Sequence, residues 1–269
     1  MEPGTGLTIL GGAIGSAKLI EKMLGPTADF LGNELQSWTE KRITNVKNIF
    51  SNAEKKLGNE IEKKGTVPPK VLKEILDDGS FVNDELSIEY FGGILACSRT
   101  KNGLDDRATS FLNLLSQLSF YQIKSHYIIY HSIRKILKGE ELLFTKLPHR
   151  EKMRIFIPME DFINSIGNIN KEEKIIIISH IFFGLKRIGL IEDFTYSSSS
   201  LKYDDKGNKM PGIRIVPSEY GAQLFLWTYG IRNKSTKMIL SNDLELKRLE
   251  TISLPDKIIS YPKVEKKKE

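Results

Sequence analysis

Cysteine and histidine are scarce in this 269-residue chain, which contains one cysteine, Cys97, and four histidines. A single cysteine excludes an intramolecular disulfide and is typical of a reducing compartment. It also excludes cysteine-rich zinc sites, and four histidines scattered along the sequence argue against a histidine metal cage. We therefore predict a chain without a metal ion or other cofactor.

A long uncharged hydrophobic run is also missing, because the apolar stretch 4–17 is followed by Lys18, Glu21 and Lys22. About 20 apolar residues are needed to cross a bilayer, and no basic region precedes the stretch as in a secretory signal. We divide off residues 1–24 as a glycine-rich arm and expect a cytoplasmic protein. The arm is either a mobile or helix-packing segment or one that enters a membrane on activation.

Charge of one sign is not concentrated in any long block. The chain has 40 Lys and Arg against 34 Asp and Glu, a formal net charge of +6. This surplus permits contact with nucleic acid or anionic lipid, but the acids are interspersed with the bases. The pattern favours solvated helix faces over a dedicated binding patch.

Helical periodicity dominates the first half of the chain. Apolar residues recur at intervals of three and four, and predict helices at 26–57, 70–78, 80–98 and 107–138. Gly58 is a plausible stop for the first helix, and Asn83 or Asp84 a plausible start for the third. Gly92 and Gly93 lie inside the third helix, where they indicate either a close backbone approach or a kink. We expect residues 25–150 to form a helical bundle.

The second half changes to mixed structure. The sequence predicts a strand at 153–158, helices at 159–166 and 171–190, a hairpin over 193–216, and a final helix capped by Ser218. This is the order of a winged helix-turn-helix unit, so we expect a mainly α protein whose helical bundle is followed by a winged-helix-like α+β domain. That domain spans 151–240, and residues 241–269 form a C-terminal helix and a charged tail.

The second helix of this unit is unusually apolar for one that reads DNA. It contains four successive isoleucines, Ile175 to Ile178, and the sequence Ile181-Phe182-Phe183. A recognition helix carries polar side chains to base edges, whereas so apolar a helix is expected to be buried. The pattern favours a structural or partner-binding wing, with nucleic-acid binding as the alternative.

The most chemically suggestive stretch is the loop that carries Arg99, Asp105, Asp106 and Arg107. These side chains could bind an anion or a metal, or perform acid–base work. The simpler interpretation is that Asp105 or Asp106 caps the following helix while Arg99 pairs with one of them. A hydrolase or nuclease that uses the two carboxylates remains a third hypothesis for the function.

Aromatic residues and histidines share faces of the helix predicted at 107–138. His126 lies four residues before Tyr130, and Tyr127 four before His131. Such rings could stack on bases, but a bundle interior explains them equally and is the interpretation we favour. Cys97 lies on an apolar stripe, and the sequence contains no Gly-x-Ser-x-Gly elbow. We therefore predict no catalytic residues.

Several segments together resemble the bacterial abortive-infection alpha (Abi-alpha) family, over residues 25–230. They are 24–29 (LGPTAD), 38–42 (WTEKR), 67–72 (VPPKVL), 89–96 (EYFGGILA), 98–100 (SRT) and 105–107 (DDR). The resemblance implies a role in phage defence, in which an infected cell stops growing or dies, and it implies no catalytic residues. We expect a non-enzymatic effector or adaptor acting through a protein partner, self-association or a membrane. The alternative is a winged-helix nucleic-acid-binding regulator.

Overall fold

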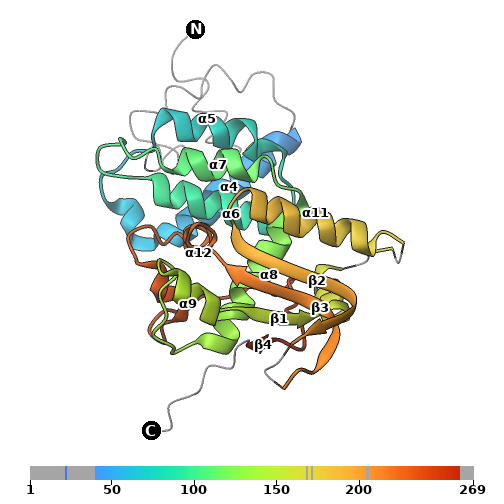
Figure 1. Ribbon diagram of the computed structural model, residues 1–269. Helices are drawn as coiled ribbons and strands as arrows, with labels where there is room; N and C mark the ends of the chain where they lie inside the picture. The colour runs from blue at the N-terminus through green and yellow to red at the C-terminus, as the bar shows by residue number, and fades with distance from the viewer. Residues whose placement is uncertain (1–21, 23–39, 168, 171, 204–205, 261–269) are drawn as a thin grey trace. The chain divides into compact units, whose positions relative to one another are not determined.

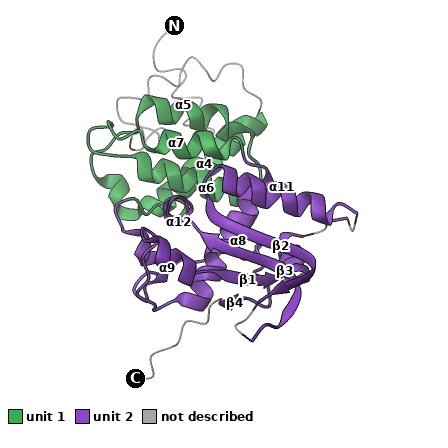
Figure 2. Ribbon diagram, in the orientation of Figure 1, with its two compact units in different colours: residues 1–117, 227–232 green, residues 118–226, 233–269 purple. Residues whose placement is uncertain are grey.

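The protein divides into two compact units, each described here by itself. The structure, a computed structural model, describes residues 22, 40–167, 169–170, 172–203 and 206–260 (Figure 1). Unit 1 consists of residues 1–117 and 227–232, and unit 2 of residues 118–226 and 233–269 (Figure 2). The described residues form nine α-helices and one four-stranded antiparallel sheet, which confirms a mainly α protein with a small β component.

Four α-helices make up the described part of unit 1. They are α4 (Glu40–Leu57), α5 (Pro69–Asp77), α6 (Glu85–Ser98) and α7 (Ala108–Leu115). The central element is α6, which packs against the other three and is buried throughout from Tyr90 to Ser98. The predicted start of α6 is confirmed, because the Asp84 side chain accepts a hydrogen bond of 2.8 Å from the backbone N–H of Ser87. Gly58, with φ of +50°, ends α4 as predicted.

A close backbone contact fixes α6 within unit 1. A Cβ atom added at Gly93 would lie 2.1 Å from the carbonyl oxygen of Thr228. Beside this contact, the ring of Trp227 packs on that of Phe111 with centroids 5.0 Å apart. The prediction that the glycine pair permits a close approach is therefore confirmed for Gly93.

Unit 2 combines helices with the sheet. Its elements are α8 (Phe120–Leu137), α9 (Leu147–Lys152), β1 (Ile155–Pro158), α10 (Met159–Ile166), α11 (Lys174–Arg187), β2 (Ile191–Lys202), β3 (Lys209–Pro217), most of α12 (Glu219–Thr228) and β4 (Ile259–Ser260). The strand order is β2-β3-β1-β4, and Ile215 of β3 pairs with both Ile155 and Phe194. Helix α11 lies against β2 and α8 (Figure 1). The expected succession of strand, helix, helix, hairpin and helix is present.

The single helix predicted at 107–138 is wrong, because the structure has two helices there. Helix α7 ends at Leu115, and α8 begins at Phe120 with Ser119 as its N-cap. The Ser119 side chain accepts from the backbone N–H of Gln122, and the Gln122 side chain accepts from that of Ser119, so this capping box starts a new helix. Helix α8 belongs to unit 2, whereas α4 to α7 belong to unit 1.

The expected C-terminal helix is also absent from the described residues between 241 and 260. A short 3-10 helix (Thr236–Leu240) is followed by irregular chain that ends in β4, which pairs with β1. Buried Arg134 of α8 donates hydrogen bonds to the carbonyl oxygens of Ile239, Ser241 and Leu244, which holds this segment in place without helical hydrogen bonds.

Some expectations fall outside the described residues: the N-terminal arm, the first part of the helix predicted at 26–57, and the charged tail from 261. Within the described part, no helix combines the length and the apolar composition that crossing a bilayer requires.

Candidate functional site

Arg99 does not pair with a carboxylate of the suggestive loop, contrary to our expectation. Its guanidinium donates to four backbone carbonyl oxygens: those of Lys22 at 2.9 Å, Glu60 at 3.1 Å, Ile61 at 3.2 Å and Lys63 at 2.5 Å. Partial burial lowers the pKa of Arg99. The side chain therefore ties together the 3-10 helix Gly58–Glu62 and the chain beside it, which is a structural role.

The two carboxylates of the same loop face different cations. Asp105 receives two hydrogen bonds from the Arg107 guanidinium, at 2.8 and 2.7 Å, and these bonds hold its pKa below the ordinary value. Asp106 is 3.9 Å from the ammonium group of Lys70. The N-cap of α7 is Arg107, whose own side chain makes no capping bond, but the Asp105 carboxylate accepts a hydrogen bond of 3.3 Å from the backbone N–H of Arg107. The predicted acceptance of a backbone N–H at this helix start is therefore confirmed for Asp105. Because the carboxylates diverge, they are poorly placed for joint acid–base chemistry.

The histidines of α8 are buried in unit 2 among other rings. The Nε2 atom of His126 lies 3.0 Å from the carbonyl oxygen of Gly221, and the rings of His126 and Tyr130 have centroids 4.7 Å apart. Burial lowers the pKa of His126 to about 3, and burial with the nearby Arg248 and Arg134 lowers that of His131 to about 3. The predicted face sharing is confirmed, and these buried rings are not available to stack on bases.

Cys97 is a structural cysteine of α6. Its side chain is buried, and its Sγ lies 3.8 Å from the carbonyl oxygen of Trp227. Burial raises the pKa of the thiol well above its ordinary value, so the reactive thiolate is disfavoured.

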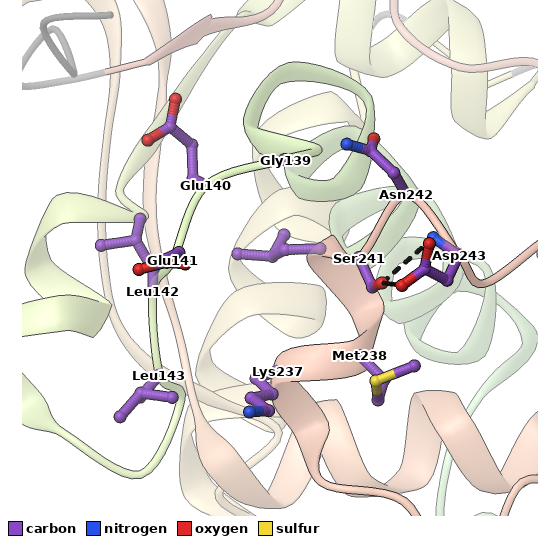
Figure 3. Close-up of a pocket in the computed structure, with 11 residues that line it drawn as sticks. Gly139, Glu140, Glu141, Leu142, Leu143, Lys237, Met238, Ser241, Asn242 and Asp243 are labelled. Atoms are coloured by element: carbon purple, nitrogen blue, oxygen red, sulfur yellow. Dashed lines mark hydrogen bonds between the residues drawn. The ribbon is translucent and has the colours of Figure 1, made fainter. Parts of the chain in front are cut away.

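A pocket of about 610 Å³ opens in unit 2 between the loop after α8 and the segment after α12. It is lined by Gly139, Glu140, Glu141, Leu142, Leu143, Lys237, Met238, Leu240, Ser241, Asn242 and Asp243. The carboxylates of Glu140 and Asp243 lie on opposite sides of it, and Asp243 accepts from the Ser241 hydroxyl at 3.4 Å (Figure 3). Among the described residues, no three His, Cys, Asp or Glu side chains converge as a metal site would require.

Helix α11 presents apolar side chains on both of its sides, although we expected a mostly buried helix. Ile178, Ile181, Phe182 and Leu185 are buried as expected, but three other apolar residues are exposed. Ile175 is 43%, Ile176 69% and Phe183 61% exposed. We call these three residues the α11 face.

Side chains of β2 extend this apolar surface. The rings of Phe183 and Phe194 meet edge to face with centroids 5.0 Å apart, and Phe194 stacks on Tyr196 at 6.1 Å. The hydroxyl of Ser179 lies 2.5 Å from that of Tyr196, which ties α11 to the strand. The α11 face therefore stands on a fixed support, as a preformed contact surface does.

The site residues predicted from sequence thus serve structural roles, and the α11 face is the feature that sequence reasoning missed. A signal was present: seven apolar residues in the nine from Ile175 to Phe183 are more than one helix face can bury. No known protein family, characterised protein or solved structure matches this chain.

Proposed function

We propose that this chain is a cytoplasmic effector or adaptor of phage defence by abortive infection, and that it acts through protein contacts made by the α11 face. The observation that carries the contact role is the exposure of Ile176 and Phe183 on a rigid helix. Clustered exposed apolar side chains on a folded protein are typical of interaction sites. The defence role is supported by the resemblance to the Abi-alpha family, which rests on segments between residues 24 and 107, all of them in unit 1.

The order of elements in unit 2 supports a winged-helix-like reading of the domain. Helix α8, strand β1, helices α10 and α11, and the β2–β3 hairpin occur in the order found in such units, with the short helix α9 inserted between α8 and β1. In that arrangement α11 takes the place of the helix that reads DNA. Its exposed Ile175, Ile176 and Phe183 suit an apolar partner better than base edges, which require polar partners.

A winged-helix nucleic-acid-binding regulator is the rival function. Exposed Lys202, Lys206 and Lys209 near the hairpin tip favour it. Binding through these residues would depend on phosphate contacts and fall steeply with salt. We expect the chain to bind neither duplex DNA nor duplex RNA, even at low ionic strength. Binding that weakens with added salt and is lost in Lys202→Glu would favour the rival function.

The test is phage plating on bacteria that express the chain. We expect the wild-type chain to reduce the plating efficiency of at least one phage in a diverse panel, and we expect Ile176→Glu and Phe183→Glu to abolish this protection. Leu104→Glu is the matched control, because Leu104 is 79% exposed but lies in unit 1. The control should protect as well as the wild type, with equal amounts of folded protein confirmed by circular dichroism.

Two results would contradict the proposal. If the wild-type chain protects against no phage in the panel, the defence role is rejected. If Phe183→Glu protects as well as the wild type, the α11 face is not the acting surface. Protection that instead requires residues 1–24 and accompanies dye leakage from the cells would assign the activity to a membrane.

A further inference from the structure

The exposed charges around α11 are separated by sign. Glu172 and Glu173 are exposed in the turn before the helix, while Lys186 and Arg187 are exposed in its last turn. Acidic residues at the start of a helix and basic residues at its end stabilise that helix by interacting with its dipole, and this requires only one chain. The charges alone therefore do not require a partner, but the apolar α11 face between them remains in contact with water.

Ion pairs within the chain compensate two of the lysines of α11 and so leave the two ends of the helix more clearly different in charge. The ammonium group of Lys174 lies 3.2 Å from Glu160, and that of Lys186 lies 2.6 Å from Asp193. The first pair compensates the cation nearest the acidic end, and the second compensates one cation of the basic end. Arg187 is then the principal cation at the C-terminal end of α11.

We propose that the α11 face binds a second copy of this chain, with the two α11 helices antiparallel. This inference rests on the proposed function and names the partner of the same surface. The midpoint between Ser179 and His180 is equally far along the sequence from Ile176 and Phe183, and equally far from Glu172 and Arg187. A two-fold axis at that point pairs Ile176 of each copy with Phe183 of the other.

The same axis makes the charges complementary. It places Glu172 of each copy beside Arg187 of the other. A two-fold interface uses one patch twice, so it requires a patch that is complementary to itself. A partner of uniform charge would attract one end of α11 and repel the other. The charge pattern therefore favours a second copy.

The size of the surface sets the strength of the association. Helix α11 has 14 residues, which at 1.5 Å per residue gives a length of about 21 Å. Two such helices bury less area than the roughly 1,200–2,000 Å² of a stable interface. We therefore expect a weak, reversible dimer whose population depends on the protein concentration.

Sedimentation velocity of the full chain over a range of concentrations is the first measurement. We expect a reversible monomer–dimer equilibrium, which Phe183→Glu weakens by at least about tenfold because a carboxylate is placed against Ile176 of the other copy. Leu104→Glu serves again as the control and should leave the equilibrium unchanged. A wild-type chain that stays monomeric at all concentrations overturns the inference.

Charge reversal then tests the antiparallel arrangement. Glu172→Arg and Arg187→Glu should each weaken the homodimer by about tenfold, since each places like charges together twice. Mixing the two variants should form a heterodimer more readily than either forms a homodimer, and the double variant should recover wild-type association. Glu245→Arg, which is exposed and distant in sequence from α11, is the control for net charge. Dimers that ignore these reversals overturn the antiparallel pairing.

The inference and the proposed function fail in different ways. A chain that is monomeric, but loses phage protection with Phe183→Glu, overturns the self-association and leaves the proposed contact surface in place. A chain that dimerises with the expected charge dependence, but protects equally when the dimer is disrupted, supports the self-association and rejects its role in defence.

Discussion

At the scale of single residues, burial in α8 strongly lowers the pKa values of two histidines. His126 and His131 are imidazoles enclosed by rings such as Phe225, whose centroid lies 5.0 Å from that of His131. A charged imidazole at either position would lose its hydration, and this desolvation is the largest cause of both lowered pKa values. Both histidines are therefore neutral in the folded chain, and they make its stability sensitive to acid.

The pH dependence of unfolding tests whether His126 is neutral in the folded chain. Its pKa is about 3 when folded, against about 6.5 in an unfolded chain, so the unfolded state binds the proton first as the pH falls. The free energy of unfolding should therefore fall below pH 6.5, by about 2 kcal/mol per buried histidine at pH 5. His126→Gln keeps an N–H donor for Gly221. It should reduce the loss between pH 7 and pH 5 by about 2 kcal/mol, measured by urea unfolding.

Equal pH dependence in the variant and the wild type would contradict the burial of a neutral imidazole at this position. The comparison uses the change with pH and not the absolute stability, because Gln also packs less well than the ring. The wild-type chain thus provides its own reference at pH 7.

At the scale of elements, a close backbone contact fixes helix α6 within unit 1. Helix α6 can approach the chain at Thr228 only because Gly93 has no Cβ. A methyl group there would meet backbone atoms, which cannot rotate away as a side chain can.

Gly93→Ala should therefore destabilise the protein by about 3 kcal/mol or more, although alanine is the better helix former. Ser110→Ala, at an exposed position of α7, is the control for a change of helix propensity without a backbone contact. The control should change the free energy of unfolding by less than about 1 kcal/mol. Similar costs at both positions, measured by urea unfolding, would contradict the backbone contact at Thr228.

Local signals explain which elements could be predicted from the sequence. The caps at Asp84 and Ser218, the stop at Gly58 and the hairpin all follow from short-range chemistry and are present. The break between α7 and α8 was missed because apolar periodicity continues across it, although Ser119 and Gln122 carry a capping-box spacing. The C-terminal segment could not be predicted, because it depends on long-range bonds from Arg134 to backbone carbonyls.

The candidate site was harder to predict than the fold. Arg99 and Asp105 looked like reactive residues because the sequence does not reveal the partners that give them structural roles. The Arg99 guanidinium binds backbone carbonyl oxygens, which any residue supplies, and the Asp105 carboxylate binds the neighbouring Arg107. Whether Ile176 and Phe183 are exposed depends on how much of α11 is covered by the sheet and α8. The periodicity of apolar residues in the sequence does not give this coverage. Only a count of apolar residues per helix face pointed to this surface.

At the scale of the whole molecule, apolar side chains fall into two classes: those that stabilise a unit and those that are exposed to a partner. Phe182 and Phe183 represent the two classes at adjacent positions of α11, because Phe182 is fully buried and Phe183 is 61% exposed. The central claim is that Phe183 belongs to a contact surface and contributes little to folding.

The most direct test is the free energy of unfolding of Phe182→Ala and Phe183→Ala, measured with urea at protein concentrations low enough to keep the chain monomeric. We predict a loss of about 3–5 kcal/mol for Phe182→Ala, which leaves a cavity, and less than about 1 kcal/mol for Phe183→Ala. Equal losses at the two positions would show that Phe183 is part of the core, which would contradict the account.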